Sequence, residues 1–219
     1  MRFRKVTMII GNPSAKIEYP DYWILTVSVD GFPSISTLDE QIVEEIYNRR
    51  GHGLNRTSLV KTILKLFNEG YIFTFKLNSI HDEVRQKWEP SLSNITEILN
   101  GDESVYYGMT DLGASTWETM SRPAWDLYAT GGRYIDDPEF EATSSNRLLL
   151  EKLLVREDFV EHIIPSSIMW TNERPWKVFY WKTLPEAWTL RLSTKSLLPD
   201  NNSDLLFAND DWYTNPFEV

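Results

Sequence analysis

Apolar residues occupy every second position in the first clearly patterned stretch of the chain. These residues are Trp23, Leu25, Val27 and Val29, and most of the positions between them are polar. A period of two is typical of a half-buried β-strand. Residues 30–33 then read Asp-Gly-Phe-Pro, which favours a turn. The pattern therefore predicts a strand that ends in this turn.

Two helices follow, each with apolar residues at helical spacing and a residue suited to cap its first turn. Thr37 and Glu40 lie three residues apart, the spacing of a capping box. Asn55 or Thr57 can cap the second helix, which Gly70 ends. The apolar stripe of the first helix is Leu38, Ile42, Val43 and Ile46. The apolar face of the second is Leu59, Val60, Ile63, Leu64 and Phe67.

Shorter elements continue the pattern after Gly70. Residues 71–77 alternate in the manner of a strand, and Asn94 can cap a short helix over residues 94–100. Residues 105–109 return as a strand, and Thr110 caps a helix that runs through Met120. Helices and strands are thus mixed along the first half of the chain.

The C-terminal half combines a helix with a β-hairpin. Residues 146–163 have helical spacing, and their inward positions are Leu149, Leu150, Leu153 and Leu154. Residues 175–183 carry bulky rings on both faces of a strand, and residues 188–192 form its antiparallel partner. We expect this hairpin to pack on the helix.

The order of elements and one short motif resemble a known architecture. Two capped helices precede a strand, and residues 107–113 are similar to the Tyr-x-Leu-Thr-x-x-Gly ending of many winged-helix domains. Residues 37–120 therefore resemble a winged helix-turn-helix module. The chain departs from the family because a longer, helix-containing insertion replaces the short wing.

The resemblance implies that the second helix, residues 56–68, lies in the major groove of DNA. Residues 49–65 contain five Lys or Arg side chains and no acidic residue, which would suit phosphate contacts. The candidate nucleic-acid-binding residues are Arg49, Arg50, Arg56, Ser58, Lys61, Thr62 and Lys65. The solvated side of an amphipathic helix has the same pattern, however.

A turn-rich sequence, Thr-Gly-Gly-Arg at residues 130–133, predicts the boundary between two regions. Residues 1–130 would hold the first strand and the winged-helix-like module. Residues 131–219 would hold a smaller region with the helix, the hairpin and an acidic, aromatic tail. The expected fold class is therefore α+β.

Charge points to a protein partner more than to DNA. The formal net charge of −10 opposes binding to a polyanion and suits a basic partner. The tail, residues 200–219, contains acids and aromatic rings, which can steer and anchor a partner. Packing of the tail on its own domain would also explain these rings. The candidate protein-binding residues are Asp210, Asp211, Trp212, Tyr213 and Phe217.

Known catalytic and metal-binding patterns are missing from the sequence. It lacks cysteine, a Gly-x-Gly-x-x-Gly or Walker loop, and a Gly-x-Ser-x-Gly elbow. Asp158 and His162 lie one helical turn apart, but no third metal ligand accompanies them. The acidic residues around Pro138 lack the spacing of an EF-hand and favour a solvated loop. We therefore expect no cofactor and no metal. The acidic residues in that loop are Asp136, Asp137, Glu139 and Glu141.

Three functional interpretations follow from these patterns. The first is a non-catalytic protein-binding protein, such as an inhibitor, an immunity-type protein or a regulatory protein. The second is a DNA-binding regulator that uses residues 56–68, and the third is an enzyme whose site residues are distant in sequence. The lack of cysteine fits a reducing compartment, so we expect a cytoplasmic protein. The sequence has no run of about 18 apolar residues that could cross a bilayer, so we expect no membrane partners.

Overall fold

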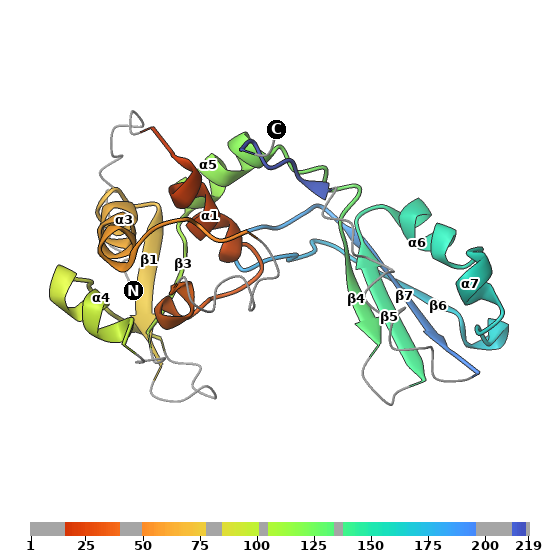
Figure 1. The fold of residues 1–219 in the computed structure, drawn as a ribbon. Coiled ribbons are helices and arrows are strands. Elements are labelled where there is room, and N and C mark those ends of the chain that lie inside the picture. Colours follow the sequence, from red (N-terminus) through yellow and green to blue (C-terminus); the bar gives the residue numbers. More distant parts are fainter. Residues whose placement is uncertain are drawn as a thin grey trace, which may run out of the picture. The chain divides into compact units, whose positions relative to one another are not determined.

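Helices and antiparallel strands alternate along the chain, which confirms the predicted α+β class (Figure 1). The computed structural model describes residues 16–39, 50–77, 85–100, 105–133, 138–195 and 212–217. The chain divides into two compact units, Met1–Trp117 and Glu118–Val219, called unit 1 and unit 2 below. The division falls within helix α5 (Asp111–Ser121), and the boundary predicted at residues 130–133 coincides with strand β4 (Ala129–Arg133).

The first element of unit 1 is a helix, α1 (Tyr19–Val27), so the predicted strand over residues 23–29 is wrong. Ile24, which an alternating strand would point outward, is fully buried beside Trp23 and Leu25. A helix that is apolar on all sides is stable when its whole circumference is buried. Pro20 in the first turn and the bond from the Glu18 N–H to Asp21 Oδ2 (2.9 Å) favour a helix start here.

A 3₁₀ turn, η1 (Ile35–Leu38), takes the place where the first of the two capped helices was expected to begin. Ser34 caps it by accepting a bond from the Ser36 N–H, whereas the Thr37 hydroxyl donates to the Ser34 carbonyl (2.7 Å). Thr37 therefore does not cap this element, and the rest of the predicted helix, residues 40–49, lies outside the described residues.

The second predicted helix is confirmed as α3 (Arg56–Asn68), and Asn55 rather than Thr57 is its cap. Asn55 Oδ1 accepts a bond from the Ser58 N–H (2.9 Å). Gly70 has a φ of +79°, the left-handed conformation that glycine adopts without strain after a helix. The Tyr71 N–H donates to the Leu66 carbonyl (2.9 Å), which closes the helix end.

A three-stranded antiparallel sheet follows α3, with β1 (Ile72–Lys76) between β2 (Gln86–Lys87) and β3 (Val105–Met109). The predicted strands at residues 71–77 and 105–109 are thus confirmed. Helix α4 (Leu92–Ile98) lies between β2 and β3 in the sequence and packs against α3. Its cap is Ser91, with Asn94 at the third helical position, so the expected cap at Asn94 is three residues too late.

The Thr-x-x-Gly part of the motif at residues 107–113 fastens helix α5 to the start of β1. The Thr110 N–H donates to the Tyr71 carbonyl (3.0 Å), and Thr110 Oγ1 accepts from the Gly113 N–H (3.2 Å). A Cβ on Gly113 would lie 2.1 Å from Tyr71 O, closer than atoms can approach. Glycine is therefore required because the helix and the backbone of Tyr71 lie in contact.

Unit 2 contains a four-stranded antiparallel sheet in the order β4-β5-β7-β6. Strand β5 (Glu139–Ser144) and β7 (Ala187–Ser193) are central, and β4 and β6 (Met169–Glu173) form the edges. The predicted strand at residues 188–192 is confirmed as β7. Its partners are β5 and β6, so the pairing expected with residues 175–183 is wrong.

Residues 175–183 do not form a strand of either sheet. Trp176 forms an isolated bridge with Leu184, and the backbones of Phe179 and Lys182 bond to each other in a turn (3.2 Å). The alternation of aromatic rings that suggested a strand is therefore produced by a folded loop, hereafter the 176–184 loop. Its rings pack with other aromatic residues of unit 2.

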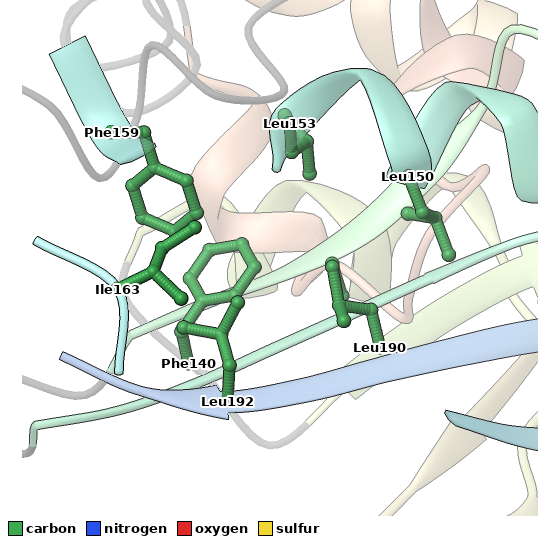
Figure 2. Packing of buried hydrophobic residues seen from close by; sticks show 8 residues of the cluster. Phe140, Leu150, Leu153, Phe159, Ile163, Leu190 and Leu192 are labelled. Carbon is green, nitrogen blue, oxygen red and sulfur yellow. The ribbon is translucent and has the colours of Figure 1, made fainter. Parts of the chain in front are cut away.

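Two helices cover one face of the four-stranded sheet, as Figure 2 shows from close by. The predicted single helix over residues 146–163 is α6 (Arg147–Leu153) followed by α7 (Glu157–Val160), with a turn between them. The expected packing on a hairpin is wrong as to the hairpin, but one of its predicted strands, β7, does pack against this helical region. The helices contribute Leu150, Leu153 and Phe159 to this core, and Ile163 joins it from the segment after α7. The strands contribute Phe140, Ala142, Leu190 and Leu192.

Candidate recognition surfaces

The side chain of Arg56, at the start of α3, is bound by other parts of unit 1. Its guanidinium forms an ion pair with Asp39, the residue after η1. It also donates to Asn100 Oδ1 (2.7 Å) and to the Leu99 carbonyl (3.0 Å) at the end of α4. Arg56 therefore joins three segments of the unit, and its charge is matched by a neighbouring carboxylate.

Lys65, two turns further along α3, is paired with a buried carboxylate. Its Nζ lies 2.8 Å from Oδ2 of Asp21, whose side chain is 4% exposed. Partial burial lowers the pKa of Lys65, but the hydrogen bond and charge of Asp21, helped by Glu69 and Glu18, outweigh it and raise the pKa above 10.5. Lys65 thus fastens α3 to α1.

The other predicted DNA-contacting residues differ in their exposure. Ser58 and Thr62 are half-buried, and the Thr62 hydroxyl donates to the Ser58 carbonyl (3.0 Å). Lys61 is exposed, and the described residues offer it no ion pair. Arg50 is exposed and lies over the Tyr19 ring at 5.8 Å.

Arg49 lies outside the described residues. Of the three cations in α3, Arg56 and Lys65 form ion pairs with acidic residues of the same unit. These pairs weaken the attraction of the helix for phosphates.

The predicted tail residues are only partly described. Trp212 is half-buried, and its ring lies 4.7 Å from that of Tyr128 and 5.3 Å from that of Trp125. Tyr213 is also half-buried, with its ring 5.0 Å from that of Trp212, whereas Phe217 is 38% exposed. Asp210 and Asp211 lie outside the described residues. Trp212 therefore packs on its own unit, as the alternative interpretation of the tail proposed.

The acidic residues around Pro138 were expected to lie in a solvated loop, but two of them lie in a strand. Glu139 and Glu141 belong to β5, and Glu141 forms an ion pair with Arg191 of β7, while residues 136 and 137 lie outside the described chain. His162 Nε2 lies 3.5 Å from Oε1 of Glu161. Within the described residues, no group of His, Asp and Glu side chains could hold a metal ion.

Exposed aliphatic side chains occur on α6, on α7 and in the turn between them. Leu148 is 65% exposed, Val155 is 74% exposed and Val160 is 47% exposed. Leu148 lies in α6 two residues before the buried Leu150, Val155 lies in the turn after α6, and Val160 is the last residue of α7. We call these three residues the aliphatic patch. The sequence interpretation missed it because it predicted one continuous helix over residues 146–163 and considered only the inward positions of that helix.

Helix length gives one further observation about the described part of the chain: none of its helices is long and apolar enough to cross a membrane. Comparison of the whole chain with known proteins gives no match among family models, curated proteins or solved structures.

Proposed function

We propose that this chain is a non-catalytic, cytoplasmic protein-binding protein with a winged-helix-like core, and that its partner is a basic protein. The observation that carries the proposal is the aliphatic patch on an acidic protein. Single exposed aliphatic residues are common, but three within one segment of 13 residues, on α6, α7 and the turn between them, offer an anchor for a partner. The net charge of −10 would steer a basic partner towards the chain.

The winged-helix-like interpretation is supported by the order of elements in unit 1. Helix α1 is followed by Ser34, which forms a single bridge to Tyr106 of β3, and then by α3 and the antiparallel strands. The insertion with α4 stands where a short wing would be. Because fold and function are separate properties, this architecture alone does not imply DNA binding.

In this proposal α3 stabilises unit 1 rather than binding DNA. A helix that meets DNA needs its cations available for phosphate oxygens. Asp39 and Asp21 already bind Arg56 and Lys65. Recruiting either cation to DNA would leave a carboxylate close to the phosphates, where it repels them.

Co-purification with matched variants tests the protein-binding proposal. Tagged wild type expressed in its native cells should retain a basic protein that is lost from the double variant Leu148→Glu/Val155→Glu. Both side chains are exposed, so the fold should tolerate the changes. Leu92→Glu is the control, because Leu92 is 56% exposed on α4 of unit 1. Equal recovery of the same protein with all three forms would contradict the role of the patch.

A DNA-binding regulator is the second proposal, and the exposure of Lys61 together with the element order favours it. It requires affinity for duplex DNA that falls steeply with salt, because phosphate contacts release counterions. Fluorescence anisotropy with a labelled random duplex at low and moderate salt measures this dependence. Binding that weakens on Lys61→Glu and at higher salt would support it, and a flat titration at low salt would exclude it.

A further inference from the structure

The C-terminal segment of unit 2 makes the contacts of a bound peptide. The Trp212 carbonyl accepts a bond from the Ala124 N–H (2.6 Å), and the Thr214 N–H donates to the Ser121 carbonyl (2.8 Å). Both bonds join the segment to the end of α5 and the residues that follow it, Ser121 and Ala124. Residues 212–217 thus combine backbone pairing with a large aromatic anchor.

The receiving side of this contact consists of Trp125, Tyr128 and Phe179, called the aromatic receptor below. The centre of the Trp212 ring lies 4.7 Å from that of Tyr128, 5.3 Å from that of Trp125 and 6.1 Å from that of Phe179. Tilted and edge-to-face arrangements at these separations are favourable beyond the area that they bury. The Trp212 ring is therefore the anchor that gives the contact its specificity.

Residues outside the segment hold the aromatic receptor in place. Trp125 Nε1 donates to Glu118 Oε1 (3.1 Å), and Lys182 pairs with the same carboxylate while its Nζ lies 5.0 Å from the Trp125 ring. The Trp125 carbonyl accepts from the Ser145 hydroxyl (2.9 Å).

Rings from the 176–184 loop complete this support. The Trp125 and Phe179 rings lie 6.0 Å apart, and the Tyr128 and Phe179 rings lie 5.2 Å apart. None of these contacts involves residues 212–217. We therefore expect the receptor to keep its shape without the segment, which would lower the cost of binding an incoming peptide.

We propose that the aromatic receptor is a binding site for a tryptophan-bearing peptide and that residues 212–217 occupy it in cis. This inference goes beyond the proposed function, because it involves other residues than the aliphatic patch. Attachment to the same chain raises the effective concentration of the segment, so a modest intrinsic affinity keeps the site filled. A partner segment of the same kind gains access when the chain's own segment leaves.

A peptide-binding experiment on the full chain tests the proposal. The probe is a fluorescein-labelled peptide with the sequence of residues 210–217, and the readout is fluorescence anisotropy. Trp212→Ala removes the anchor in cis, so this variant should bind the peptide at least about tenfold more tightly than wild type. Phe217→Ala is the matched control, since Phe217 is exposed and should leave the site filled. The peptide in which Trp212 is replaced by alanine should not bind.

A second variant keeps the test decisive if Trp212→Ala fails to fold. Thr214→Pro removes the N–H that donates to Ser121 while every receptor ring is kept. It too should bind the unmodified peptide more tightly than wild type does. Circular dichroism establishes that each variant is folded. A folded Trp212→Ala or Thr214→Pro chain that binds the peptide no better than wild type would overturn the proposal.

Discussion

Replacement of Lys65 by methionine should destabilise unit 1 far more than the same replacement of Lys61, one helical turn earlier. Lys65 Nζ is 2.8 Å from Asp21 Oδ2, whereas Lys61 is exposed and pairs with no described carboxylate. Methionine keeps much of the aliphatic length of lysine and removes the charge. The Asp21 carboxylate would then keep its bond from the Glu18 N–H but lose its cation.

The size of the effect follows from the exposure of the two partners. Breaking a fully buried ion pair costs about 3–5 kcal/mol, and an exposed pair contributes about 0–1 kcal/mol. The Asp21 side chain is 4% exposed and that of Lys65 is 35% exposed, so solvent screens the pair from one side. We therefore expect Lys65→Met to lower the free energy of unfolding by about 2 kcal/mol, between those limits. Lys61→Met should stay within about 0.5 kcal/mol of wild type.

Urea denaturation followed by circular dichroism measures this difference, and hydrogen exchange of the α1 amides assigns it to unit 1. The expected pattern is earlier unfolding and faster α1 exchange for Lys65→Met alone. Equal stability of the two variants would refute the idea that Lys65 fastens α3 to α1. Lys65 would then be a cation that can bind another ligand, such as a phosphate.

Three further predictions concern stability. The stability difference between wild type and Lys65→Met should persist below about pH 10.5 and shrink as the pH rises through the raised pKa of Lys65, because the ammonium then loses its proton; urea titrations at several alkaline pH values check this. Gly113→Ala should lower the melting temperature because its Cβ would meet Tyr71 O at 2.1 Å, whereas Gly31→Ala, with open space around it, should not. Leu190→Ala should cost unit 2 about 2–5 kcal/mol in chemical denaturation, since Leu190 is fully buried under the helices; a loss under 1 kcal/mol would count against this core.

Local signals in the sequence were sufficient for part of unit 1. Asn55, the apolar face of α3 and Gly70 define one helix from start to end, because capping and left-handed backbone are properties of single residues. Strand β3 was predicted with its bounds, Val105–Met109, since turn residues and a capping threonine flank it. These elements depend little on distant partners.

Contacts between distant residues decided the elements that the sequence pattern misassigned. The alternation around Trp23 suggested a strand because Ile24 was assigned to the outside, yet the fold buries both. The rings of residues 175–183 suggested a strand, but Trp176 pairs with Leu184 and the chain turns between them. Pro20 and Asp21 were the local signals that could have indicated the start of α1.

The candidate sites were less predictable than the fold for the same reason. Helical spacing places Lys61 and Lys65 on the outer side of α3, but it gives no information about Asp21, which is 44 positions away from Lys65. The pairing of Trp212 with Trp125 and Tyr128 likewise joins segments that are remote in sequence. Residue types identify candidates, and only the folded chain shows which of them are already engaged.

Photo-crosslinking at the aliphatic patch tests the proposed protein-binding function most directly. The photoreactive residue p-benzoylphenylalanine would replace Leu148 in the full chain, and, as a control, the exposed Leu92 of unit 1. Irradiation in the native cells should give one discrete protein adduct from position 148 and none from position 92. The absence of an adduct at 148, together with crosslinking to DNA from the same residue placed at Lys61, would contradict the proposal.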